Sequence, residues 1–128
     1  MKKRARARLV VIEDSSEYLD YLATLTERAG YAVATFTAAA AALQYIEHNP
    51  VGLVVTDVFM PEMDGFEVLR EIRGRFPKLP IVAISGGGLS MPMCLKAMER
   101  LGARATFVKP VDADALIACI ARLTGTLN

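Results

Sequence analysis

"LVVTDVFMPEMDG", residues 53–65, decides the fold class of this chain. Leu53, Val54 and Val55 form an apolar run with the pattern of a strand that is buried on both faces. The run leads directly into Asp57, although protein interiors rarely hold a carboxylate without a partner. A buried strand that ends in an acid needs a partner for that acid, and the rest of the chain supplies candidates.

The composition is that of one globular domain. The chain has 128 residues, of which 53% are hydrophobic and 23% charged, with a formal net charge of +1. This length suffices for a core of its own, and the near-neutral charge gives no case for nucleic-acid binding. We interpret residues 1–7 as a solubilising basic tail, because the basic residues there have neither aromatic neighbours nor a helical period. No apolar run approaches the roughly 18 residues of a membrane span, so we expect no membrane partner and a cytoplasmic location.

Apolar strands alternate with helical patterns along the chain. We expect strands at 9–12, 31–36, 53–56, 81–84 and 105–108, each followed by a helix. Thr37 and Asp112 are expected to cap the second and the fifth helix. Strands of near-continuous apolar residues between helices predict an α/β fold with a doubly wound five-stranded parallel sheet, (βα)5. We therefore expect a single domain over residues 1–128 without an output domain.

The two cysteines show no metal-ligand spacing. Cys94 and Cys119 lie in helix-like segments, and we expect both to be buried free thiols in a reducing compartment. Three methionines in the fourth helical segment, Met91, Met93 and Met98, predict either an adaptable docking face or filling of the core.

Polar side chains follow four of the predicted strands. Glu13 and Asp14 come after the first, Asp57 after the third, Ser85 after the fourth and Lys109 after the fifth. Because the carboxyl ends of parallel strands meet at one edge of the sheet, these side chains are expected to converge. Three carboxylates repel one another unless a cation is bound, and carboxylate oxygens suit Mg²⁺. A lysine, a hydroxyl and Mg²⁺ around a carboxylate nucleophile predict phosphoryl transfer to Asp57.

The same residues occur in the order and spacing of a known family. From about residue 8 to its end, the chain resembles the receiver domain of bacterial two-component response regulators. The resemblance is carried by Glu13-Asp14, "TDVFMPEMDG" (56–65), "ISGGG" (84–88), "LGA" (101–103) and "FVKP" (107–110). It implies a flavodoxin-like strand order 2-1-3-4-5. It also implies a phosphoacceptor regulatory domain that assists its own phosphorylation, rather than an enzyme.

The resemblance implies a role for each polar residue. Asp57 would accept a phosphoryl group from a histidine kinase or a histidine phosphotransfer protein. The other implied roles are a Mg²⁺ set, a catalytic pair and a switch pair. The Mg²⁺ ligands would be Glu13, Asp14, Asp57 and the backbone carbonyl of Phe59. The catalytic pair would be Lys109 and Ser85, and the switch pair Ser85 and Phe107.

Three further features follow from the resemblance. The Lys109-Pro110 peptide bond is expected to be cis. The face made of the fourth helix, fifth strand and fifth helix would bind a downstream protein, with the chain itself a monomer or weak dimer. Phe59 and Gly87, which flank the path of an attacking water in this family, cannot hydrogen-bond to it through their side chains, so the phosphoryl group should be lost slowly.

Other functions fit the sequence less well. A haloacid-dehalogenase-type phosphatase needs a second aspartate two residues after the first, where this chain has Phe59. A flavodoxin-type cofactor site needs a Ser/Thr/Gly-rich loop after the first strand, where Glu13-Asp14 begins an acidic loop. A receiver-like scaffold that works without phosphorylation stays open as the alternative. A simpler role for Asp14, as the cap of the first helix, also stays open.

Overall fold

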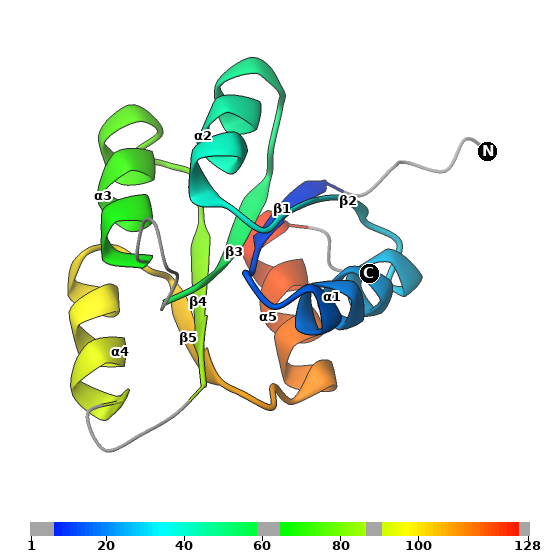
Figure 1. Ribbon diagram of the computed structural model, residues 1–128. Helices are drawn as coiled ribbons and strands as arrows, with labels where there is room; N and C mark the ends of the chain where they lie inside the picture. The colour runs from blue at the N-terminus through cyan, green and yellow to red at the C-terminus, as the bar shows by residue number, and fades with distance from the viewer. Residues whose placement is uncertain (1–6, 59–64, 87–90, 126–128) are drawn as a thin grey trace.

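The computed structural model describes residues 7–58, 65–86 and 91–125, and over these residues strands and helices alternate (Figure 1). The strands are β1 (Arg8–Ile12), β2 (Ala32–Phe36), β3 (Leu53–Asp57), β4 (Ile81–Ser85) and β5 (Ala105–Val108). The helices are α1 (Ser16–Arg28), α2 (Ala39–His48), α3 (Gly65–Arg75), α4 (Met91–Arg100) and α5 (Ala113–Thr124).

The strands form one parallel sheet in the order β2-β1-β3-β4-β5. The predicted fold class and strand order are thus confirmed. β3 and β4 each run one residue further than predicted, so that Asp57 and Ser85 are the last residues of buried strands. β2 starts one residue later than predicted, because the backbone N–H of Tyr31 still donates to Thr26 O at the end of α1 (3.2 Å).

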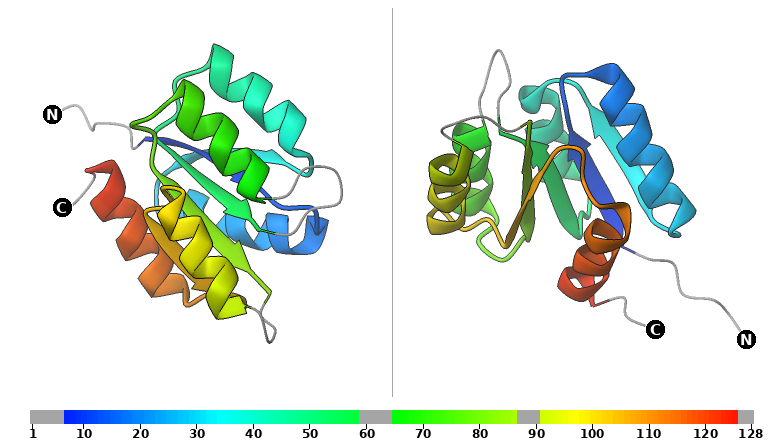
Figure 2. Two further views of the ribbon diagram at one scale, coloured as in Figure 1. Left: turned by 90° about the vertical axis from the view of Figure 1, so that its left-hand side faces the viewer. Right: turned by 90° about the horizontal axis from the view of Figure 1, so that it is seen from below.

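Helices cover both faces of the sheet, with α1 and α5 on one face and α2, α3 and α4 on the other (Figures 1 and 2). Each face has its own hydrophobic core, because alternate side chains of a strand point to opposite faces. On β1, for example, Val11 packs on the α1/α5 face and Val10 on the opposite face. All five positions of β3 and of β4 are buried, which fixes the ends of these two strands rigidly in the middle of the sheet.

Some local predictions need correction. Thr37 does not cap α2, because the N-cap position is Ala38, whose methyl side chain cannot accept a hydrogen bond. Asp112 does cap α5, and its Oδ1 accepts a hydrogen bond from Ala115 N (3.0 Å). Cys119 is buried as expected, but Cys94 is only half-buried. Among the α4 side chains that the structure describes (93–100), only Met98 is buried, so Cys94, one turn earlier, stays partly accessible to solvent.

Of the three α4 methionines, Met98 has the predicted place in the core; a docking role stays a prediction, and the side chain of Met91 lies outside the described residues. Met98 lies in the core, whereas Met93 is 77% exposed. In the described ranges, none of the helices has the length and apolar character required to cross a bilayer.

Candidate functional site

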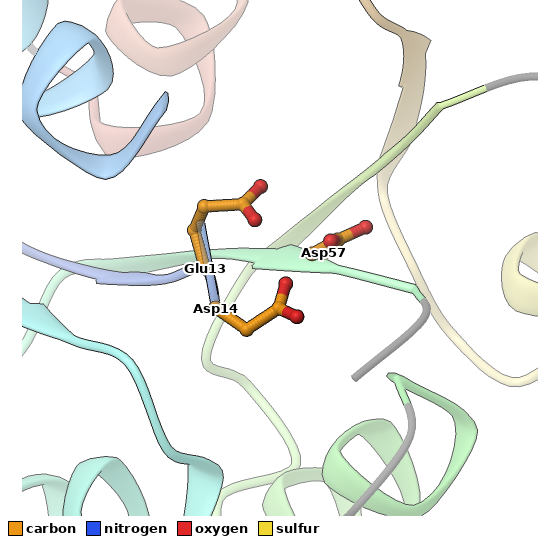
Figure 3. Close-up of side chains that lie close together, drawn as sticks. All are labelled: Glu13, Asp14 and Asp57. Carbon is orange, nitrogen blue, oxygen red and sulfur yellow. The ribbon is translucent and has the colours of Figure 1, made fainter. Parts of the chain in front are cut away.

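The carboxyl ends of β1 and β3 bring three acids together (Figure 3). Ile12 pairs with Thr56 in the sheet, so Glu13 and Asp57 follow side by side. One carboxylate oxygen each from Glu13, Asp14 and Asp57 lies within 4.8 Å of the other two. Glu13 and Asp57 are buried, with 0% and 5% of their surface exposed, while Asp14 is open to solvent. The predicted convergence of these acids, called the acid cluster below, is confirmed.

Lys109 reaches into the acid cluster from the end of β5. Its Nζ lies 2.5 Å from Glu13 Oε1 and 3.4 Å from Asp57 Oδ2. Burial alone would lower the pKa of Lys109, but the hydrogen bond to Glu13 and the charges of Asp57 and Glu13 outweigh burial and raise that pKa. The ammonium therefore stays charged and compensates part of the negative charge. The Lys109-Pro110 peptide bond is cis, as predicted.

Glu13 is held from two sides. Its Oε2 accepts a hydrogen bond from the backbone N–H of Ser15 (2.9 Å), and its Oε1 faces Lys109. Burial raises the pKa of the Glu13 carboxyl, and the contacts to Lys109 and Ser15 oppose that rise. The ion pair with Lys109 and the hydrogen bond from Ser15 thus offset part of the cost of burying this carboxyl.

Asp14 is not the cap of α1, so that alternative is wrong. The N-cap is Ser15, whose Oγ accepts a hydrogen bond from Tyr18 N (3.4 Å). Asp14 lies one residue too early for this geometry, and its carboxylate lies among those of Glu13 and Asp57 instead.

Ser85 ends β4 next to the strand that carries Asp57. The side chain is fully buried, and among the described residues its Oγ has no hydrogen-bond partner. A buried hydroxyl without a partner costs free energy, so this position suits an oxygen supplied by a ligand. Phe107, the other half of the expected switch pair, is half-buried and packs against the core on the α1/α5 face. The switch roles of both residues stay predictions.

The donor set fits Mg²⁺. It consists of carboxylate oxygens from the end of β3 and from the two residues that follow β1, and one of these carboxylates, Asp14, is open to the solvent from which Mg²⁺ would take its water ligands. The expected backbone ligand, Phe59, lies outside the described residues, as does Gly87.

Tyr18 is a site residue whose role sequence reasoning missed. Its ring lies under Lys109 Nζ, 4.7 Å from ring centroid to nitrogen, and its hydroxyl accepts a hydrogen bond from Val111 N (3.1 Å). The sequence predicted only that Tyr18 lies on the buried face of the first helix. An aromatic residue one turn after the Glu13-Asp14 pair was the available signal.

The chain is thus a doubly wound α/β domain whose sheet carries three acids and a lysine at its carboxyl edge. The family model described as response regulator receiver domain matches residues 9–121. The chain belongs to this family.

Individual relatives agree with the family match. The response regulator protein TodT of Pseudomonas putida is 32% identical over 112 residues, covering 88% of this chain and 48% of TodT. The transcriptional regulatory protein FixJ of Azorhizobium caulinodans is 37% identical over 110 residues, covering 86% of this chain and 51% of FixJ. The solved receiver domain of NtrX from Brucella abortus matches with a TM-score of 0.86 and 30% identity, covering 93% and 99% of the two chains. The chain spans about half the length of the curated relatives TodT and FixJ.

Proposed function

We propose that Asp57 is the phosphoacceptor of this receiver domain. The observation that carries the proposal is the position of Asp57, which is 5% exposed at the end of β3, with two further carboxylates and Lys109 Nζ around it. A histidine kinase or a histidine phosphotransfer protein would supply the phosphoryl group. A carboxylate oxygen of Asp57 attacks phosphorus, the phosphorus–nitrogen bond to the donor histidine breaks, and its electron pair stays on the imidazole.

The neighbouring residues neutralise and orient the transferred group. Glu13, Asp14 and Asp57 would hold Mg²⁺, which when bound offsets negative charge on the carboxylates and on the phosphoryl oxygens. Lys109 would neutralise a further phosphoryl oxygen. Ser85 would donate its hydroxyl proton to another, which gives its buried Oγ the partner that the described residues do not supply.

The output of the domain would be a change of binding surface. The family resemblance favours the face of α4, β5 and α5, and two residues of these elements, Met93 of α4 and Val108 of β5, are 77% and 46% exposed. Two large exposed apolar side chains suit contact with a downstream protein. In this proposal the domain regulates a partner, and the chemistry at Asp57 serves that regulation.

The test is mass spectrometry of the intact protein after incubation with a small phosphodonor and Mg²⁺. Wild type should gain one phosphoryl group, Asp57→Ala none, and Asp20→Asn, which changes an exposed acid of α1, one. Wild type without a phosphoryl group would refute the proposal and favour a scaffold that works without phosphorylation. A phosphoryl group on Asp57→Ala would refute the assignment of Asp57.

A further inference from the structure

Tyr18 contacts the segment that carries Lys109 at two points. Lys109 Nζ lies 4.7 Å from the centroid of the Tyr18 ring, and Val111 N donates to the Tyr18 hydroxyl (3.1 Å). Pro110 has no N–H, so the backbone donors of this segment are at its two ends. Lys109 N donates to Ser85 O (2.6 Å), which fixes one end to β4, and Tyr18 fixes the other end to α1.

Tyr18 is itself held in place. Its ring packs against the core on the α1/α5 face and lies 5.4 Å from the ring of Tyr21, centroid to centroid. Its backbone N–H donates to the N-cap Ser15, and the backbone N–H of Ser15 donates to Glu13. The start of α1, the acid cluster and Lys109 thus form one connected unit.

We propose that Tyr18 is a positioning residue that holds the Lys109 ammonium beside Asp57 for phosphoryl transfer; the proposal rests on the proposed function above. A lysine side chain is flexible, and its ammonium is attracted to the face of an aromatic ring. The carboxylates of Glu13 and Asp57 are shared with other charges during transfer, whereas the ring remains a fixed contact. Tyr18 therefore gives the ammonium a contact that persists while its carboxylate partners change.

The experiment measures the rate at which the protein is phosphorylated by a small phosphodonor with Mg²⁺. Tyr18→Leu removes the ring face and should lower the rate about tenfold. Tyr18→Phe keeps the ring and should restore most of the rate. The matched control is Tyr45→Leu on α2, since Tyr45 also lies 5.4 Å from another ring, that of Phe36, and its hydroxyl also accepts a hydrogen bond. The control should keep the wild-type rate.

A double-mutant cycle separates positioning from a structural role. In a Lys109→Met background, Tyr18→Leu should cause no further loss of rate, because there is no ammonium left to position. An equal loss in both backgrounds, or a wild-type rate in Tyr18→Leu, would overturn the proposal. If Tyr18→Leu unfolds, Tyr18→Met takes its place in the cycle. Wild type that takes no phosphoryl group would overturn the proposed function itself, and this inference with it.

Discussion

Replacing Asp14 by asparagine should stabilise the metal-free protein. Three carboxylates within 4.8 Å of one another face one ammonium, so the acid cluster with Lys109 carries a formal charge of −2, three negative charges and one positive. Two unit charges 4.8 Å apart repel by about 0.9 kcal/mol in a water-like dielectric. The water-like value applies because Asp14 is exposed. Glu13 and Asp57 repel Asp14 and Lys109 attracts it, so for pairs at similar distances the net repulsion of the Asp14 charge is about 1 kcal/mol.

The helix start changes this magnitude little. Ser15, not Asp14, caps α1, so the substitution leaves the capping hydrogen bond intact. The negative charge lost near the start of α1 costs a few tenths of a kcal/mol. The free energy of unfolding should therefore rise by about 0.5 to 1 kcal/mol, and the melting temperature by about 2 to 4 °C.

Urea denaturation at low salt, first with a chelator and then with Mg²⁺, measures both parts of the expectation. Mg²⁺ at ten times its dissociation constant should stabilise wild type by about 1.4 kcal/mol and Asp14→Asn by much less. Asp20→Asn, an exposed acid of α1 outside the acid cluster, is the control and should change neither value. High salt should shrink the metal-free difference. Equal metal-free stability of wild type and Asp14→Asn, with an equal response to Mg²⁺, would refute the electrostatic reasoning.

Three further predictions concern pH, backbone and lifetime. Burial raises the pKa of Glu13 in the folded state, so folded protein holds this proton to a higher pH than unfolded protein does. The carboxyl's contribution to stability should then fall as pH rises from about 4.3 to that raised pKa. Unfolding of chelated protein across this range should therefore show a larger loss of stability with rising pH in wild type than in Glu13→Gln, which keeps the other acids of the chain. Gly102→Ala should cost about 1 to 2 kcal/mol in thermal unfolding, because Gly102 has φ +112° and a Cβ would crowd an arginine side chain; Gly74→Ala, on an open part of α3, should cost nothing. Phosphorylated wild type should decay slowly after donor removal, and Phe59→Asn paired with Gly87→Glu should shorten its lifetime; a wild-type lifetime of seconds that these changes leave unaltered would contradict the reasoning.

The sheet could be predicted from the sequence because its central strands are buried on both faces. Such strands need mostly apolar side chains, and the runs Leu53–Val55 and Ile81–Ile84 supply them. The alternation with helices then restricts the connections to right-handed crossovers. Convergence of the acids follows from this topology, since parallel strands place their carboxyl ends on one edge.

Helix caps were less predictable, because a cap depends on one backbone turn. The sequence offers Asp14 and Ser15 as neighbouring acceptors before α1, and only the dihedral angles of Ser15 select it. Thr37 has a suitable side chain, but α2 begins after Ala38 and has no side-chain cap. When neighbouring residues have similar side chains, the sequence predicts the position of the N-cap only to within one residue, and the backbone geometry of the helix start determines which residue it is.

The partner of Lys109 also depends on tertiary geometry. Two strands, β3 and β4, lie between β1 and β5, so β1 and β5 are roughly 14 Å apart at the usual strand spacing. Even so, Lys109 Nζ lies closer to Glu13, which follows β1 (2.5 Å), than to Asp57 at the end of β3 (3.4 Å). The segment after β5 must therefore turn back over the edge of the sheet. Tyr18, which belongs to the helix after β1, binds that segment through Val111 and lies under the ammonium. Under the proposed function, the first helix would help to place Lys109 after the last strand, and a short shift from Glu13 toward Asp57 would bring the ammonium to a phosphoryl oxygen.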